Sequence, residues 1–320
     1  MTAWLDLLWL LLVVALASWA VAVVGLSLVG GSALRPQLPP GPRARRAVLL
    51  ALLPWLVPIT VVGALAVVAA SKPAGLTSDH CLIHGTGHPH ICFEHLPAIG
   101  LGPTHAAGAA VLLLAVLLPA LRLLLREWQL ATRIDALRRL AVGWRRLRIV
   151  SSAEPIALAV GGRDSTVLLS RGLLDRLDPR ERRIVLGHEL AHLRQGDPVR
   201  HRLFEWLLLL QPGWTGRPLR RHWRQAREEL ADDRVAREYG AEAVAGVLLK
   251  VIRMGRSAEA AGPAFVGPEP RRRVARLIHT DEPMTRPLFE WGYAALLLLT
   301  GVTAAIAHHS LETALGWVIG

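Results

Sequence analysis

Four long apolar runs limit what this chain can fold into more than any other feature. Each approaches or exceeds the roughly 20 residues that an α-helix needs to cross a bilayer. The first run lacks a basic start and is too long for a cleaved signal peptide. Hydrophobic residues make up 52% of the chain, which is high for a soluble protein. The sequence therefore predicts an α-helical membrane protein with four transmembrane helices, at about residues 4–29, 47–70, 106–125 and 289–307.

The distribution of basic residues predicts how these helices are oriented. The 71–105 connection has one lysine and no arginine, whereas four arginines follow the first run. Since positively charged loops stay in the cytoplasm, we expect a multi-pass protein of the cell membrane, with both termini outside and residues 126–288 inside. The net charge of +12 then reflects arginines that orient the helices and meet anionic headgroups. The four arginines are Arg35, Arg43, Arg45 and Arg46.

No helix-turn-helix, zinc-finger or RNA-recognition pattern accompanies the arginines. We therefore expect no direct binding of nucleic acid, and the expected partners are the lipid bilayer and a protein substrate.

The stretch His188-Glu189-Leu190-Ala191-His192 fits the pattern H-E-x-x-H. On a helix, residues i and i+4 share a face, so both imidazoles can bind one zinc ion. The glutamate projects beside that face, where it can take a proton from the attacking water. The pattern thus predicts His188 and His192 as zinc ligands and Glu189 as the general base. The competing interpretation is a chance match on an ordinary surface helix of a histidine-rich chain.

Signals for a helix flank this motif on both sides. Asp178 is placed as an N-cap, Pro179 takes the first helical position, and Glu181 completes a capping box. Gly196-Asp197-Pro198 then ends the helix. Gly187, directly before the first histidine, allows another element to approach the metal closely.

A catalytic zinc takes three protein ligands and leaves its fourth position to water. The helical stretch 221–239 offers the candidates, because it carries two carboxylate pairs at i,i+4 spacing. One member of a pair can bind the metal while the other accepts a proton from a ligating histidine. A solvated, charged helix face is the competing interpretation. The four carboxylates are Glu228, Glu229, Asp232 and Asp233.

The order of these motifs resembles the membrane zinc peptidases of the BlaR/MecR antirepressor type, and the related HtpX and CAAX-prenyl-protease group. The shared pattern is a strand, Ser, Gly-Leu-Leu, a capped helix, H-E-x-x-H and then E-x-x-[Ala/Cys]-Asp. The resemblance implies one catalytic zinc ion, with Glu228 rather than Glu229 as the third ligand. It implies that Asp232 holds a ligating histidine. Arg194 and Asp197 also match residues of the group, and we interpret both as structural.

The implied fold is an α-helical membrane protein with an inserted α+β, zincin-like (gluzincin) peptidase domain. Residues 1–125 form three transmembrane helices with the outward loop 71–105, residues 126–288 the cytoplasmic zinc peptidase domain, and residues 289–320 the fourth helix and a short outward tail. Short apolar runs at 147–150, 156–160 and 166–169 predict a small sheet. The last two runs form a hairpin. We expect Thr166–Ser170 to be the edge strand that holds substrate.

Three further segments of the predicted peptidase domain carry weaker signals. Phe204–Leu210 is too short to span, so it packs on the bilayer surface or against the spans. Ala261–Pro270 reads as a loop, and Arg271–Leu277 as an arginine-rich packing helix. His222, Tyr239 and nearby arginines are the candidates for stabilising the oxyanion of the reaction.

The outward loop contains both cysteines of the chain, Cys81 and Cys92. Two cysteines outside the cytoplasm most simply form a disulfide. Alternatively, histidines beside the two thiols bind copper or zinc. These histidines are His80, His84, His88, His90, His95 and His105.

The function we expect is that of a membrane-bound zinc endopeptidase with a cytoplasmic active site. The BlaR/MecR resemblance implies proteolysis of a repressor in signal transduction. Only a short tail follows the fourth run, so β-lactam sensing through a large C-terminal domain is not expected. One alternative is an HtpX-like quality-control protease. Another is a non-catalytic receptor or scaffold with structural zinc, against which Glu189 argues because a structural site needs no base.

Overall fold

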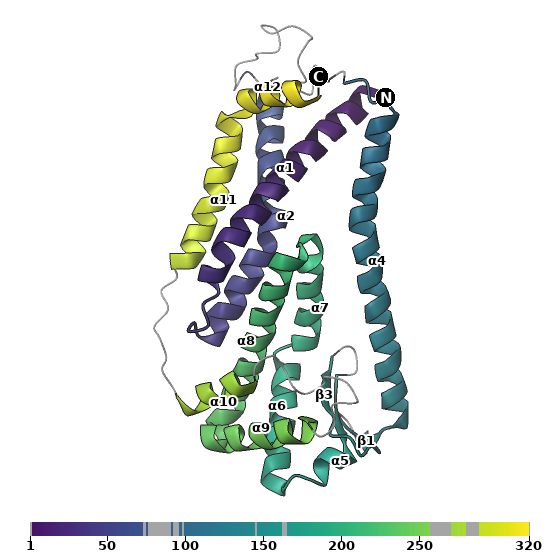
Figure 1. The fold of residues 1–320 in the computed structure, drawn as a ribbon, viewed down its shortest axis with the longest axis vertical. Coiled ribbons are helices and arrows are strands. Elements are labelled where there is room, and N and C mark those ends of the chain that lie inside the picture. The colour runs from purple at the N-terminus through teal and green to yellow at the C-terminus, as the bar shows by residue number, and fades with distance from the viewer. Residues whose placement is uncertain are drawn as a thin grey trace.

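The computed structural model of the chain places the long apolar helices at one end and the small sheet at the other (Figure 1). It describes residues 2–72, 75, 91, 96–97, 99–144, 146–161, 165–256, 270–279 and 288–319.

Among the described residues, four helices are long and apolar enough to cross a membrane, which matches the predicted number. They are α1 (Thr2–Ala33), α2 (Pro40–Ser71), α4 (Pro103–Leu140) and α11 (Leu288–Ile306). Helix α4 continues well past the predicted end of its span and reaches the sheet end of the molecule (Figure 1). None of its residues is fully buried, whereas α2 packs extensively against α1 and α11.

The predicted outward tail is a helix, α12 (His308–Ile319), that bends away from α11 (Figure 1). Its Glu312 is buried and accepts a hydrogen bond of 3.0 Å from the backbone N–H of Ile91. Nδ1 of His105, at the start of α4, accepts a 3.1 Å hydrogen bond from the Gly102 N–H. Cys81, Cys92, the loop histidines before His105 and the loop 261–269 lie outside the described residues.

The sheet has four strands in the order β1-β2-β4-β3. Strands β3 and β4 form the predicted antiparallel hairpin, and β2 lies parallel to β4 on its other side. The prediction that Thr166–Ser170 is the edge strand is wrong, because β4 lies between two neighbours and all five of its residues are buried. The two edge strands are β1 and β3, and β3 is the one next to β4. The bounds are β1 Val142–Trp144, β2 Leu147–Val150, β3 Ala157–Val160 and β4 Thr166–Ser170.

Helices complete this end of the molecule. Helix α6 starts with the predicted capping box, in which the Asp178 carboxylate accepts from the N–H groups of Arg180 and Glu181. The other helical elements are α5 (Arg171–Leu174), α7 (Asp197–Leu207), the 3-10 helix η2 (Leu208–Leu210), α8 (Gly213–Tyr239), α9 (Ala241–Arg256) and α10 (Pro270–Ile278), while α6 spans Pro179–Arg194. Helix α8 thus begins eight residues before the predicted stretch 221–239.

The turn between α7 and α8 packs against the membrane helices. The indole N–H of Trp55 in α2 donates to the Leu207 carbonyl at 2.9 Å, and that of Trp19 in α1 donates to the Leu210 carbonyl at 3.0 Å. Phe204 is buried and stacks on Trp223 of α8 with ring centroids 4.7 Å apart. Of the two predicted positions for this apolar segment, packing against the spans is therefore the one observed.

Candidate metal centre

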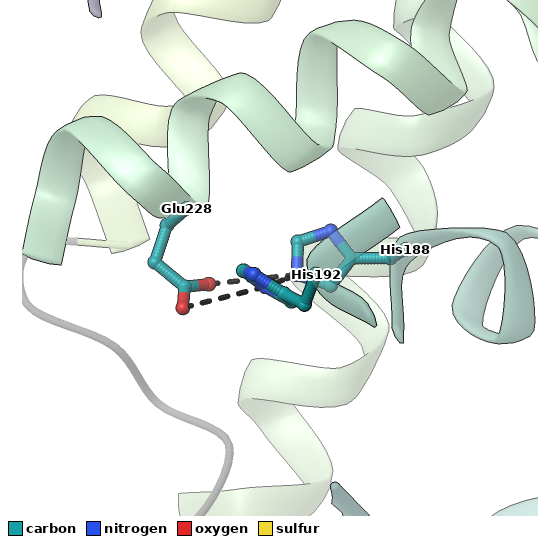
Figure 2. Close-up of side chains that lie close together, drawn as sticks. All are labelled: His188, His192 and Glu228. Atoms are coloured by element: carbon teal, nitrogen blue, oxygen red, sulfur yellow. Dashed lines mark hydrogen bonds and ion pairs between the residues drawn. The ribbon is translucent and has the colours of Figure 1, made fainter. Parts of the chain in front are cut away.

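Three side chains from two helices converge on one point. His188 and His192 lie one turn apart on α6, and Glu228 reaches toward them from α8 (Figure 2). The two Nε2 atoms are 3.1 Å apart, and they lie 3.5 and 3.6 Å from the two oxygens of Glu228. Ligands about 2.0–2.1 Å from a tetrahedral zinc are roughly 3.3 Å from one another. The three side chains therefore fit a zinc ion.

The neighbouring carboxylate Glu229 does not take part in this cluster. It is fully buried and pairs with arginines on another side of α8. The structure thus agrees with Glu228 as the candidate ligand. Among the described residues, this is the group of histidine and carboxylate side chains placed to hold a metal ion.

Each histidine is held by an aspartate at its other ring nitrogen. Nδ1 of His188 lies 3.1 Å from Asp232 Oδ1, as expected from the sequence. Nδ1 of His192 lies 2.7 Å from Asp197 Oδ2. Such contacts orient an imidazole and leave Nε2 free for the metal. Asp197, interpreted from the sequence as structural, therefore belongs to the site.

An arginine fixes each of these aspartates. Arg273 of α10 donates to both oxygens of Asp232 at 2.8 Å and lies 2.9 Å from Glu228. Nε of Arg227 donates to Asp197 at 2.6 Å. Paired, forked hydrogen bonds of this kind set a carboxylate's orientation. The arginine-rich helix predicted to have a packing role thus contacts the candidate metal centre directly.

Charges within the cluster change the protonation of its members. Burial alone lowers the pKa of His188, but hydrogen bonds to Asp232 and Glu228 raise it to about 10. Burial raises the pKa of Glu228, but the positive charge of Arg273 and contacts with the histidines lower it to about 2. Arg273 likewise outweighs burial to keep the pKa of Asp232 well below its usual range. Both carboxylates are therefore anionic at neutral pH, the form that binds a cation.

Glu189 lies beside this cluster and is buried, with 5% of its surface exposed. Burial raises the pKa of its carboxyl, and the charges of the two histidines partly offset this effect. Its carboxylate accepts a hydrogen bond from the backbone of Ala159 in β3. The predicted base is thus positioned between the histidines and the edge strand.

An open cleft of about 490 Å³ leads to the cluster. The edge strand β3 lines one wall, and residues of α4, α7 and α8 line the others. Ser170 N–H donates to the Ile156 carbonyl, so the register pairs Leu158 and Val160 with β4 by hydrogen bonds. The backbone groups of Ala157 and Ala159 therefore point away from β4. Among the described residues, no strand pairs with this edge.

Of the predicted candidates for oxyanion stabilisation, the arginines lie at the cleft and the two others do not. Neither His222 nor Tyr239 lines the cleft, and Tyr239 ends α8. The arginine candidates Arg224, Arg227 and Arg273 do line it. So does His201, which the sequence analysis did not identify because it stands in no recognisable motif.

The centre lies at the level where α2 enters its apolar run. Arg43, in the first turn of α2, contacts Glu229, the residue after Glu228. Trp55, about 18 Å further along the same helix, contacts the far end of α7. Helix α7 itself begins at Asp197, beside His192, and is roughly 16 Å long. The metal cluster therefore lies beside the start of α2, and the tip of the α7–α8 hairpin lies beside Trp55, further along the same helix.

Comparison with known proteins agrees with this site. Residues 129–216, roughly a quarter of the chain, match the model of peptidase family M48. This match contains the two histidines and Glu189 but ends before Glu228, so geometry alone supports the third ligand.

Two curated relatives match over a similar part of the chain. Over 75 residues, 23% of this chain and 25% of the relative, it is 37% identical to "Protease HtpX" of Thioalkalivibrio sulfidiphilus. Over 74 residues, 22% of this chain and 25% of the relative, it is 36% identical to "Protease HtpX" of Nitrosococcus oceani. The matches span about a quarter of the length of these relatives, and no solved structure matches. The BlaR/MecR type is not confirmed, whereas the M48 and HtpX matches together support a membrane metallopeptidase.

Proposed function

We propose that this protein is a membrane-bound, zinc-dependent endopeptidase whose active site faces the cytoplasm. The observation that carries the proposal is the joint position of three groups: the His188–His192–Glu228 cluster, the buried Glu189 beside it and the strand β3, whose outer edge pairs with no strand among the described residues. A structural zinc site needs neither a base nor an open cleft. The arginines that follow the first and third apolar runs support the orientation, because positively charged loops stay in the cytoplasm.

Each residue of the site has a separate role in the proposed reaction. The two histidines and Glu228 hold the zinc, while Asp232 and Asp197 keep the imidazoles in the ligating orientation. Zinc, when bound, supplies a Lewis acid that polarises the scissile carbonyl and makes water nucleophilic near neutral pH. Glu189 accepts the proton of the attacking water and delivers it to the leaving amine.

Substrate lies along the edge strand in the proposed complex. The outward-pointing C=O of Ala159 accepts a hydrogen bond from an extended peptide, while the Ala159 N–H stays with Glu189. Backbone pairing tolerates many side chains, so the site suits protein substrates in general. Because the Ala159 backbone also contacts Glu189, a peptide held by β3 passes directly beside the proposed base.

Two classes of substrate fit this arrangement. Damaged membrane proteins fit because the centre lies near the start of the α2 apolar run, and the named HtpX relatives are proteases. A cytoplasmic repressor is the second class. A proteomic comparison of cells that express the wild type or Glu189→Gln distinguishes them by which proteins accumulate in the variant.

The direct test of the activity uses Glu189→Gln in purified protein. The variant is expected to retain one zinc ion per chain, measured by elemental analysis, and to cleave an unfolded protein substrate about 10²- to 10⁴-fold more slowly. Glu242→Gln, an exposed change on α9, is the matched control and retains full activity. Normal cleavage by Glu189→Gln would exclude it as the base. A zinc-loaded wild type that cleaves no substrate would favour the receptor or scaffold alternative.

A further inference from the structure

Glu229 occupies an unusual position for a carboxylate next to a proposed metal ligand. Its side chain is fully buried, yet it points away from the metal cluster. It forms ion pairs with Arg43 of α2 and with Arg272 and Arg276 of α10, the last two at 3.3 and 3.6 Å. The Glu229 carboxylate therefore connects α8 with α2 and with α10.

Arg43 is the partner that belongs to the membrane part of the chain. The charge pattern of the sequence suggests that Arg43 faces lipid headgroups. Its side chain is instead 0% exposed. Nη1 donates to the Pro36 carbonyl at 3.0 Å, within the connection between α1 and α2. Arg45, two residues later, is a useful contrast because its side chain is 66% exposed and pairs with Glu290 at 3.4 Å.

Ion pairs connect α8 with two other helices. Four acidic residues of α8 pair with four arginines, three from α10 and one from α2. The acidic residues are Glu228, Glu229, Asp232 and Asp233, and the arginines are Arg43, Arg272, Arg273 and Arg276. Removing Arg43 leaves Glu229, whose side chain is 0% exposed, with Arg272 and Arg276 as partners at the longer distances of 3.3 and 3.6 Å.

Neighbouring residues on an α-helix point about 100° apart, since a turn contains 3.6 residues. Glu228 and Glu229 therefore face different partners from one rigid backbone. The contacts that hold Glu229 therefore contribute to the rotation of α8 about its axis, together with the packing of α8 against α2 and α6. That rotation sets how closely the Glu228 carboxylate approaches the two histidines, now 3.5 and 3.6 Å from it.

We propose that Arg43 is a positioning residue for the metal centre. Through Glu229 it holds α8 at the rotation that brings Glu228 to the zinc, so the α1–α2 hairpin of the membrane part sets the ligand geometry. The inference rests on the proposed zinc site but not on cleavage of any substrate.

The test measures zinc binding by full-length, detergent-solubilised protein in the Glu189→Gln background, which removes proteolysis from the readout. Arg43→Gln is expected to raise the zinc dissociation constant about tenfold, the lower end of the range for residues that support metal ligands. It is also expected to shift the visible absorption spectrum of the cobalt-substituted protein, which reports ligand geometry. Arg45→Gln removes the same charge two residues away and is expected to change neither.

A purely structural role gives a different result. If Arg43→Gln lowers the melting temperature of the zinc-free protein but leaves the zinc affinity and cobalt spectrum unchanged, the inference is wrong. If Arg43→Gln does not fold, Arg43→Lys provides the test because it keeps the charge but loses the forked geometry. An intermediate loss of zinc affinity is then expected, and an unchanged affinity overturns the proposal. Absence of proteolysis in the wild type would refute the proposed function while leaving these zinc measurements valid.

Discussion

Asp197 and His192 are joined by a 2.7 Å contact between Oδ2 and Nδ1, although a helix end separates them. The chain reverses at Gly196, whose φ of 66° lies in the left-handed region that favours glycine. This turn places Asp197 at the start of α7 and directs its carboxylate back toward α6. Arg227 of α8 then holds the carboxylate from the other side.

Replacing Asp197 by Asn is expected to weaken zinc binding about 10- to 100-fold, because the imidazole of His192 loses its charged acceptor. The measurement is competition for zinc against a chelator of known affinity. Asp233→Asn is the matched control, since Asp233 pairs with Arg276 at 2.6 Å and touches neither histidine. Equal zinc affinities of the two variants would show that Asp197 does not support zinc binding and would favour the structural interpretation.

Replacing Arg273 by Met is expected to destabilise the zinc-free protein by about 3–5 kcal/mol, because the buried Asp232 and the half-buried Glu228 lose their shared partner. The Arg273 side chain is only 4% exposed. Added zinc is expected to reduce the difference, since the cation offsets part of the unbalanced charge. Thermal unfolding in detergent with and without zinc measures both effects. Arg271→Met, an exposed change on the same helix, should have little effect, and an equal loss in both variants would contradict the assignment.

His201 is expected to make stability depend on pH. Burial and the positive charge of Arg224 lower the pKa of His201 below its usual value of 6.5, despite the opposing charge of Glu205. Below pH 6.5 the unfolded chain therefore binds this proton more readily than the folded one, so stability falls as pH decreases. The melting temperature should drop more between pH 7.5 and 5.5 in the wild type than in His201→Gln. A parallel drop in both proteins would contradict the shift.

Local signals in the sequence were enough to predict the elements that carry the metal site. The capping box at Asp178 and the spacing of the two histidines describe one helix, and a helix relies on contacts between near neighbours. The number of spans follows from composition in the same way. The hairpin of β3 and β4 was also predictable, because a short glycine-containing turn connects its strands.

Contacts between distant segments were not predictable in this way. The hairpin leaves open which of its two strands receives β2, and parallel pairing of β2 with β4 placed β3 at the edge. Arg43 has the same sequence context as Arg45, yet one is buried against α8 and the other is exposed. Only the packing of α2 against α8 separates them. From the sequence, Asp197 is only part of a signal that ends a helix. Its contact with His192 depends on the chain reversal at Gly196, which the local sequence does not reveal.

The apolar core that surrounds Phe204 and Trp223 also contains residues of α1 and α2. Helix α8, which carries Glu228, therefore shares one interior with the apolar helices α1 and α2. A fragment that begins at residue 126 would expose this interior to water. Soluble expression of residues 126–288 alone should consequently yield aggregates, because α1 and α2 form part of the scaffold that supports Glu228.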